Sequence, residues 1–309
     1  MKLLFYLSGE NPSLSKKEVL YLLKNVDKNY RIIQSIPQIL VVDTNAPPKI
    51  FTRLGLCHKV MEYMEDEINL SGSFAVRVKN LGNRKGRLEL EKEIADEIQK
   101  QNYCTLETDL ENPENEIYCL NADTLYIGRT LVDVDRSGYE KRKPQFRPYV
   151  HPSSIHPKYA RSMINLAQAQ REMLDPFCGT GGILMEAGLI GMHVYGLDIE
   201  KKMVEGCKKN LDHYGIKNYI IKKGSAEALE SYFKDVTSVA TDVPYGKSTK
   251  RKEHLYENSF EQIRRVTQRA CIVMDREYDF ERMGFTLLDT EKLRMHSTLT
   301  RFIYVLRCD

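Results

Sequence analysis

The spacing of hydrophobic blocks along residues 158–309 predicts a sheet whose strands alternate with helices. Short apolar runs are expected as strands at 173–177, 193–198, 219–222, 238–242 and 270–275. The segments between them carry apolar residues at helical spacing, and strands joined by such helices form mostly parallel, doubly wound sheets. Two further apolar runs, at 285–288 and 300–306, predict late strands that close the sheet, one of them antiparallel.

Residues 1–133 alternate differently and predict a mixed α+β structure. Strands are expected at 2–7, at 74–79, in two pieces within 31–43 and in two pieces within 116–131, and helices at 15–26, 52–66 and 89–100. Ser15 and Glu18 have the spacing of a capping box, which favours the first helix.

Residues 134–157 link these two halves and contain four prolines. Proline fixes its own φ and disfavours helix in the residue before it, so an extended linker without helices is expected. The linker is also basic and aromatic, with Lys141, Arg142, Lys143 and Arg147 near Phe146 and Tyr149. Two interpretations stay open: a solvated connector, or a strip along a phosphate backbone with a ring that stacks on a base.

Composition excludes several classes of protein. No apolar run approaches the ~18 residues of a membrane span and no signal-peptide pattern is found, so no membrane partner is expected. The seven cysteines form no Cys-x-x-Cys pair and no zinc-ligand spacing, which favours a reducing, cytoplasmic compartment without a bound metal. Net charge is −3 over residues 1–133 and +6 over residues 134–309, which permits an anionic partner without requiring one.

A glycine-rich turn follows the first predicted strand of the C-terminal half. It reads Asp175-Pro-Phe-Cys-Gly-Thr-Gly-Gly182, the layout of a nucleotide-cofactor site at the carboxyl edge of a parallel sheet. Leu184 breaks the dinucleotide fingerprint, and no Gly-Lys-Ser/Thr follows, so a phosphate loop is excluded. A carboxylate at Asp175 suits a cationic ligand without phosphate, and S-adenosylmethionine is such a ligand. Asp198, at the end of the second strand, is placed either to bind ribose hydroxyls or to cap the next helix.

A third motif, after the glycine-rich turn and Asp198, is Asp242-Val243-Pro244-Tyr245, which directly follows an apolar strand. With it, residues 158–309 resemble the class I S-adenosylmethionine-dependent methyltransferases. The motif is similar to the Asn/Asp-Pro-Pro-Tyr motif of enzymes that methylate exocyclic amines of bases. The resemblance implies that Asp242 and the Val243 carbonyl accept the amine N–H groups, and that a flipped base stacks on Tyr245.

The same resemblance implies which residues hold the cofactor. They are Asp175, Phe177, Gly179, Thr180, Gly181, Gly182, Asp198, Ile199, Ser225, Ala226 and Glu227. Two positions depart from the family pattern. Val243 stands where the first proline of the motif is usual, and Ser225 stands where an Asp usually binds the adenine amino group. Either Ser225 or Glu227 substitutes for that Asp, and the sequence does not decide between them.

Residues 51–133 resemble a THUMP domain, an RNA-binding module of RNA-modifying enzymes. The resemblance is carried by Phe74–Val78, Asp109–Pro113 and Leu125–Arg129. Five basic residues without an acid lie between Ser71 and Leu88: Arg77, Lys79, Arg84, Lys85 and Arg87. They are expected either to contact RNA phosphates, as the linker residues Lys141, Arg142, Lys143 and Arg147 are, or to form a solvated loop.

Arg147–Arg161 and His296–Arg301 are similar to segments of the archaeal and eukaryotic tRNA guanosine N2-methyltransferases that act at position ten. The resemblance then covers nearly the whole chain. It implies a ferredoxin-like subdomain at 1–50, the THUMP domain at 51–133, the linker at 134–157 and a methyltransferase domain at 158–309. It also implies tRNA as the substrate and, in some members, a small zinc-binding activator subunit.

Two other functions stay open at this point. One is methylation of a different RNA base amine, such as a ribosomal guanine N2 or an adenine N6, because the motif does not separate ring-edge amines. The other is a catalytically silent RNA-binding protein, a hypothesis that rests on Val243 and Ser225.

Overall fold

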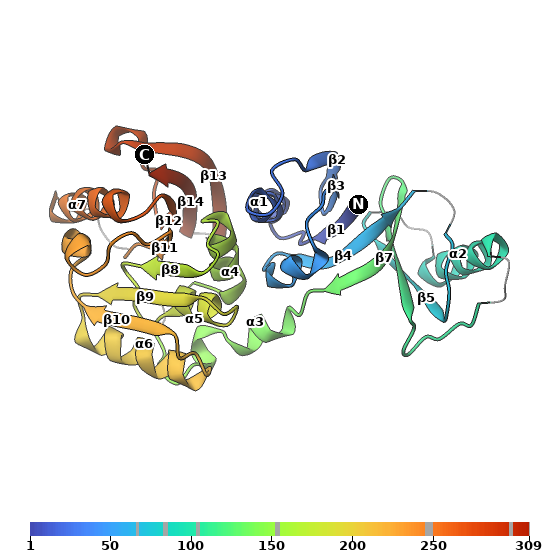
Figure 1. Ribbon diagram of the computed structural model, residues 1–309, viewed down its shortest axis with the longest axis horizontal. Helices are drawn as coiled ribbons and strands as arrows, with labels where there is room; N and C mark the ends of the chain where they lie inside the picture. The colour runs from blue at the N-terminus through green and yellow to red at the C-terminus, as the bar shows by residue number, and fades with distance from the viewer. Residues whose placement is uncertain are drawn as a thin grey trace. The chain divides into compact units, whose positions relative to one another are not determined.

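The computed structural model describes residues 1–65, 68–82, 86–102, 106–151, 155–244, 250–296 and 299–308. The chain folds into two compact units (Figure 1). The N-terminal unit consists of Met1–Pro12, Asp27–Thr52 and Cys57–Asp135. The C-terminal unit consists of Ser13–Val26, Arg53–Leu56 and Arg136–Asp309. Two short segments from the beginning of the chain are therefore part of the C-terminal unit.

The C-terminal unit contains a seven-stranded sheet in the order β10-β9-β8-β11-β12-β14-β13. Its strands are β8 (Glu172–Asp175), β9 (His193–Asp198), β10 (Tyr219–Lys223), β11 (Ser238–Asp242), β12 (Arg269–Met274), β13 (Phe285–His296) and β14 (Leu299–Cys308). The pairs among β8 to β12 are parallel, and β14 runs antiparallel to both β12 and β13. The predicted doubly wound sheet with a late antiparallel strand is confirmed.

Helices cover both faces of this sheet, which separates two hydrophobic cores. One core includes residues of α4 (Pro157–Leu166), α5 (Gly182–Gly188) and α6 (Lys201–His213). The other includes residues of α7 (Lys250–Val266) and of the short 3-10 helix Ala226–Ser231. A further 3-10 turn, Glu281–Met283, precedes β13. The glycine-rich turn and the ends of β8, β9 and β11 lie between these layers, at the carboxyl edge of the sheet.

Helix α1 (Pro12–Lys24) packs in the core of the C-terminal unit, where Leu14 and Tyr21 join the residues of α4. Its Glu18 is completely buried and accepts backbone N–H groups from Gly55, at 2.8 Å, and from Leu56, at 2.9 Å. The Asn165 side chain of α4 donates to the same carboxylate at 2.7 Å. Burial raises the pKa of Glu18. These contacts make α1 and residues 53–56 structural parts of the C-terminal unit.

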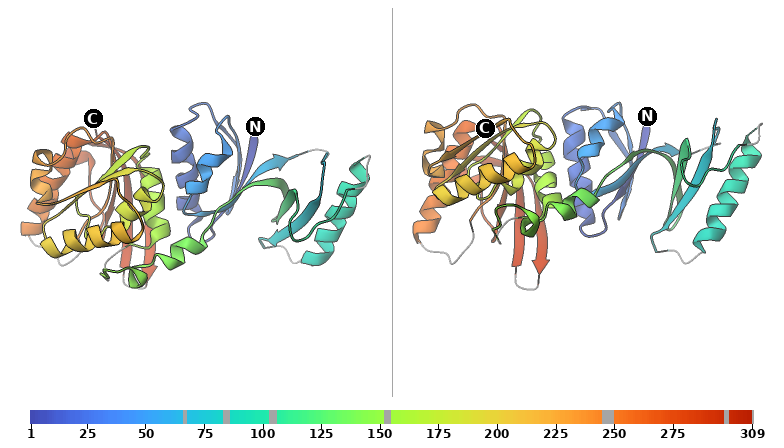
Figure 2. Two further views of the ribbon diagram at one scale, coloured as in Figure 1. Left: turned by 60° about the horizontal axis from the view of Figure 1, so that its bottom comes forward. Right: turned by 90° about the horizontal axis from the view of Figure 1, so that it is seen from below.

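The N-terminal unit has its own seven-stranded sheet, in the order β2-β3-β1-β4-β7-β6-β5. Its elements are β1 (Lys2–Leu7), β2 (Arg31–Ile36), β3 (Ile39–Asp43), the 3-10 helix Pro48–Arg53, β4 (Cys57–Met64), β5 (Phe74–Asn80), α2 (Arg87–Gln101), β6 (Asn115–Asn121) and β7 (Leu125–Asp133). Of the strand pairs that the structure describes in this sheet, β5 and β6 are parallel and the others are antiparallel. Helix α2 covers β5 and β6 (Figure 2). Strands from residues 1–50 and from residues 51–133 therefore share one sheet.

Two local predictions are wrong. Residues 57–64, expected within a helix over 52–66, form β4, which pairs with β1 and β7. Pairing on both sides overrides the local helical spacing, as tertiary contacts often do. The linker was expected to contain no helix, yet α3 (Ser137–Lys141) and the 3-10 turn Pro144–Phe146 form within it. Helix α3 ends before the first linker proline, so the proline rule limits its length and does not prevent it.

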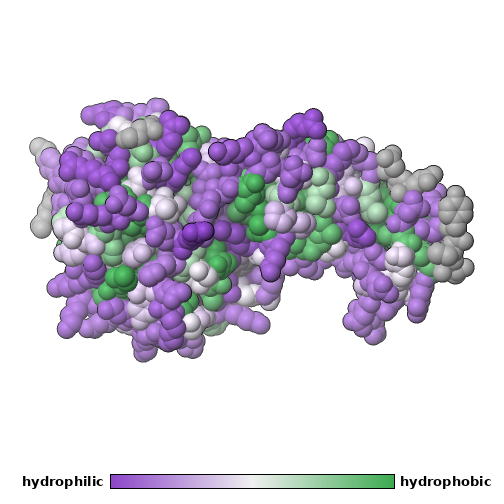
Figure 3. All heavy atoms as spheres, viewed as in Figure 1, coloured by the Kyte–Doolittle hydropathy of each residue, from purple (hydrophilic) through white to green (hydrophobic). Residues whose placement is uncertain are grey.

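No helix among the described residues is long and apolar enough to cross a membrane. Polar side chains cover most of the face shown in Figure 3. The cysteines that the structure describes at 57, 119, 178, 207, 271 and 308 are buried and unpaired by disulfides.

Candidate active site

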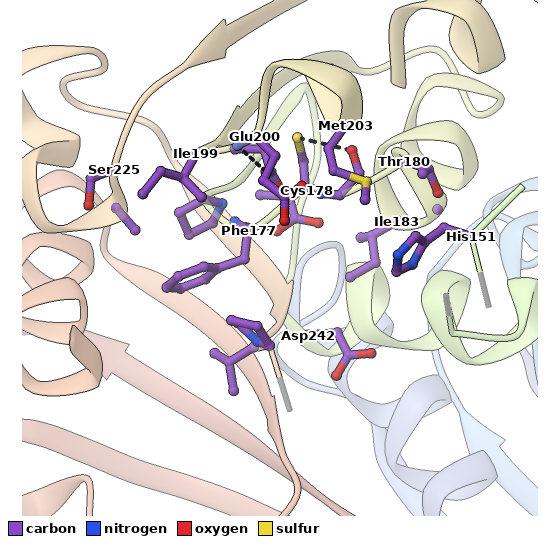
Figure 4. A pocket seen from close by; sticks show the side chains of 18 of the residues that line it. His151, Phe177, Cys178, Thr180, Ile183, Ile199, Glu200, Met203, Ser225 and Asp242 are labelled. Carbon is purple, nitrogen blue, oxygen red and sulfur yellow. Dashed lines mark hydrogen bonds between the residues drawn. The ribbon is translucent and has the colours of Figure 1, made fainter. Parts of the chain in front are cut away.

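A cavity of about 450 Å³ lies at the carboxyl edge of the C-terminal sheet. Its walls come from the glycine-rich turn after β8, the end of β9, the turn after β10 and the end of β11. Figure 4 shows Ser225 and Ile199 at one end of this cavity and His151 at the other. Residues that the sequence places far apart thus meet in one site, as expected for the carboxyl ends of neighbouring parallel strands.

The glycine-rich turn is held against β9 by backbone hydrogen bonds. The N–H of Cys178 donates to the carbonyl of Leu197 at 3.0 Å, and the N–H of Gly181 donates to the carbonyl of Cys178 at 2.8 Å. Gly179 and Gly181 have φ values of 49° and 82°, a region that favours glycine. A Cβ at Gly181 would lie 2.6 Å from the Cys207 sulfur, so a side chain is also excluded by packing.

Asp175 ends β8 and is 2% exposed. Its Oδ1 accepts the Thr241 hydroxyl at 2.6 Å and the Phe177 N–H at 3.1 Å. The pKa of Asp175 is raised to about 7, mainly by burial and to a smaller extent by the negative charges of Asp242 and Asp198, while the hydrogen bonds from Thr241 and Phe177 lower it. An ionised Asp175 is therefore costly unless a positive group comes close to it.

Asp198 ends β9 and orders two segments of backbone around the cavity. Its Oδ2 accepts the N–H of Gly179 at 2.9 Å, and its Oδ1 accepts the N–H of Glu200 at 2.9 Å. Partial burial raises the pKa of Asp198, whereas these hydrogen bonds lower it. Helix α6 begins at Lys201 and is preceded by Glu200 as its N-cap. Asp198 therefore both supports the start of this helix and lines the cavity.

Asp242 ends β11 and forms an ion pair that the sequence did not predict. The Arg301 guanidinium donates from Nη1 to Asp242 Oδ2 at 2.8 Å. The side chains are 5% exposed for Arg301 and 11% for Asp242. Arg301 is on β14, two strands away in the sheet, and no local sequence signal connects it with Asp242. Asp242 nevertheless lines the cavity, as predicted for the motif.

The departure at Val243 has a structural explanation. Its N–H donates to the Val273 carbonyl of β12 at 3.2 Å, a bond that proline is unable to make. The next carbonyl, that of Pro244, accepts the Tyr256 hydroxyl of α7 at 2.7 Å. Two hydrogen bonds thus hold this backbone at the position where the family motif has its first proline. Tyr245 lies outside the described residues.

The two candidates for the adenine-binding position differ in their placement. Ser225 and Ala226 line the cavity, as do Phe177, Gly179, Thr180, Gly182 and Ile199. Glu227 is exposed, and its Oε1 accepts the Asn258 side chain of α7 at 3.1 Å. Of the two, Ser225 is the one that the cavity reaches, and the assignment stays a prediction.

The basic residues predicted to contact RNA fall into four groups. Lys79 and Lys141 are exposed, whereas Arg77, Arg87 and Lys143 contact Leu110, Glu91 and Glu140 respectively. Arg84 and Lys85 lie outside the described residues. Arg142 pairs with the fully buried Glu186 at 2.7 Å, and Arg147 is 3% exposed and donates to the Arg142 carbonyl at 3.0 Å. The side chains of Arg142 and Arg147 thus make contacts inside the C-terminal unit, and we do not include them in the proposed RNA-binding surface.

Comparison with known proteins gives consistent results. The family described as "RMKL-like, methyltransferase domain" matches residues 144–296. A tRNA (guanine(10)-N2)-dimethyltransferase of Pyrococcus abyssi is 35% identical over 87% of this chain and 89% of its own length. The enzyme of the same name from Methanothermobacter thermautotrophicus is 32% identical over 99% of both chains. The chain belongs to the tRNA (guanine(10)-N2)-dimethyltransferase family.

Solved structures agree with this family at the level of the fold. The crystal structure of TrmN from Thermus thermophilus covers all of this chain with a TM-score of 0.54 at 18% identity. SMU.472, a putative methyltransferase solved with SAH, covers all of it with a TM-score of 0.51 at 14% identity. The mixed α/β architecture is thus shared with methyltransferases.

The cavity of this family member fits S-adenosylmethionine. Each carboxylate oxygen of Asp198 accepts one backbone N–H and keeps a second lone pair, which a ribose hydroxyl can use. Asp175 Oδ2 accepts no hydrogen bond from any residue that the structure describes, and its carboxylate suits an ammonium group. The turn at Gly179 leaves open space next to the backbone, because a Cβ added there would meet nothing within 4 Å beyond its chain neighbours.

Proposed function

We propose that this protein transfers a methyl group from S-adenosylmethionine to the N2 amine of a guanosine in tRNA, at position ten. The observation that carries the proposal is the Asp242 carboxylate at the edge of the cavity that Asp175, Asp198 and the glycine-rich turn enclose. The names of the relatives from Pyrococcus abyssi and Methanothermobacter thermautotrophicus support the nucleoside and the position.

Four parts of the chain would hold the cofactor. Asp198 would accept the ribose hydroxyls, Asp175 would face the ammonium group, Ser225 would meet the adenine edge, and the glycine-rich turn would pass close to the ligand. When bound, S-adenosylmethionine supplies a methyl carbon whose bond to the positive sulfur breaks with the electron pair going to sulfur. The raised pKa of Asp175 favours a cationic ligand, because a nearby positive charge would stabilise the ionised carboxylate.

The end of β11 would prepare the amine. An exocyclic amine is a poor nucleophile because its lone pair is delocalised into the ring. Asp242 would accept an N–H bond, and the Val243 carbonyl the second one, which directs the lone pair at the methyl carbon. Hydrogen bonds from Val243 and to Pro244 keep this backbone in place. The guanine would leave its stack to enter the site, because the chemistry requires access to the amine.

The tRNA would be bound largely through its phosphates. Lys79, Lys141 and Phe146 are exposed, Phe146 to 60%, and a ring beside a cation suits contact with unstacked nucleotides. The predicted zinc-binding activator stays part of the proposal. Assays of the chain alone and with that subunit would test whether it is needed.

The test is nucleoside mass spectrometry of an unmodified tRNA transcript after incubation with the protein and labelled S-adenosylmethionine. The proposal expects N2-methylguanosine or N2-dimethylguanosine, and the same assay gives the number of methyl groups. A different methylated nucleoside would support the alternative RNA amine. No product with or without an activator subunit, despite tight tRNA binding, would support a silent RNA-binding protein and overturn the proposal.

The matching variant is Asp242→Ala, which removes the side-chain acceptor, because asparagine also occurs at this position of the family motif. It is expected to lower turnover at least ~100-fold while leaving cofactor affinity within ~threefold, because Asp242 acts on the amine. Turnover close to that of the wild type would contradict this role of Asp242.

A further inference from the structure

We propose that Arg301 is a positioning residue for methyl transfer, which acts by fixing the Asp242 carboxylate. The inference rests on the proposed function and adds a residue from outside the motif. Arg301 directly precedes the part of β14 that is paired with β12, since Phe302 is paired with Met274 at the end of β12. From there its side chain passes the end of β12 and meets Asp242 on β11.

The geometry of the pair divides the carboxylate between two tasks. Arg301 Nη1 binds Oδ2 at 2.8 Å, and both side chains are nearly buried. A planar guanidinium holds a carboxylate oxygen in a defined direction, which a flexible ammonium does less well. With Oδ2 held in this way, the carboxylate keeps one orientation at the cavity, which fixes the direction in which it accepts an N–H of the amine. A rotation of the carboxylate would otherwise misdirect the amine, and catalysis is sensitive to such displacements.

The charges around Asp242 explain why a cation is needed here. Asp175 and Asp198 line the same cavity, and their negative charges repel that of Asp242. Arg301 supplies the opposite charge in direct contact. An Asp242 paired in this way acts as a hydrogen-bond acceptor. In the reaction the nitrogen forms its bond to carbon and releases one proton, which passes to water, while Asp242 and Arg301 keep their protonation states.

The first test compares Arg301→Gln with Arg301→Lys and with Arg307→Gln, an exposed arginine on the same strand. Arg301→Gln is expected to lower kcat by ~100-fold. Its KM for tRNA and its calorimetric Kd for S-adenosylmethionine are expected to stay within ~threefold, because the Arg301 side chain is nearly buried and is not among the residues that line the cavity. Arg301→Lys restores the charge and recovers part of kcat, and Arg307→Gln behaves as the wild type. A purely structural role would instead change Kd, KM and thermal unfolding together.

The second test is a double-mutant cycle with Asp242→Ala. If Arg301 acts through Asp242, the double variant Asp242→Ala/Arg301→Gln is no slower than Asp242→Ala alone, within ~threefold. A double variant whose kcat falls by the product of the two single losses would overturn the inference. The double variant also removes the unpaired charge, so the comparison holds even where Arg301→Gln fails to fold.

The activity of the wild-type protein distinguishes a failure of the Arg301 inference from a failure of the proposed function. A wild type that methylates tRNA, together with an Arg301→Gln variant of normal kcat, contradicts the role of Arg301 alone. A wild type that methylates no RNA overturns the proposed function and this inference with it.

Discussion

Asp175 is predicted to lower the unfolding free energy of the protein near neutral pH and to favour binding of the cofactor. It is completely buried, and its pKa is raised from 3.8 to about 7, mainly by burial. The folded protein therefore holds a proton that the unfolded chain has already released. The stability that this proton provides is fully present below about pH 4 and is lost as the pH rises to about pH 7.

The size of the effect follows from the shift. A shift of about three pKa units corresponds to about 4 kcal/mol between the two ends of that range. Asp175→Asn removes the charge and keeps an oxygen that accepts from Thr241 and Phe177, as Oδ1 does now. Relative to the wild type, the variant is expected to gain about 2 to 3 kcal/mol in unfolding free energy between about pH 5 and about pH 8.

Urea unfolding of both proteins at the two pH values measures this difference. Glu205→Gln, at an exposed carboxylate on α6, is the matched control and is expected to show no such gain. Asp175→Asn should also bind S-adenosylmethionine more weakly in calorimetry, because it lacks the charge that we propose to face the ammonium group. A stability difference that is the same at both pH values would refute the reasoning.

Three further predictions concern neighbouring parts of the C-terminal unit. Asp198→Ala is expected to weaken the binding of S-adenosylmethionine at least ~tenfold in calorimetry, because it removes the acceptor of the Gly179 and Glu200 N–H groups. An unchanged Kd would contradict the proposed cofactor site. Val243→Pro should lower the unfolding free energy by ~1–3 kcal/mol relative to Val243→Ala, which keeps the N–H donor to Val273, and equal urea midpoints would contradict this. Gly55→Ala places a Cβ 2.3 Å from the Lys158 carbonyl and should cost ~1–3 kcal/mol in thermal unfolding, whereas Gly86→Ala, with 3.4 Å of space, should be tolerated.

Local patterns predicted the elements of the C-terminal half well. The glycine-rich turn, Asp198 and Asp242 follow strands whose order fixes them at one edge, so the sequence alone brought them together. The helix expected over 52–66 failed because β4 gains its hydrogen bonds from β1 and β7, which are distant in the chain. Propensity does not carry that information.

Pairings between distant residues could not be predicted in the same way. Arg142 was expected either in a solvated connector or on a strip along an RNA backbone, and in the structure it forms an ion pair with the buried Glu186 of α5. Arg301 pairs with Asp242 across two strands. Helix α1 belongs to the C-terminal unit through Glu18, a carboxylate that the capping-box spacing had assigned to the helix end. In each case the partner is set by tertiary structure.

The central claim is methyl transfer to the N2 amine of the guanosine at position ten. The most direct measurement compares two tRNA transcripts that differ at that position only, one with guanosine and one with inosine, which lacks the amine. With labelled S-adenosylmethionine, the account predicts N2-methylated guanosine from the first transcript and no incorporation into the second. Equal incorporation into both transcripts would contradict it.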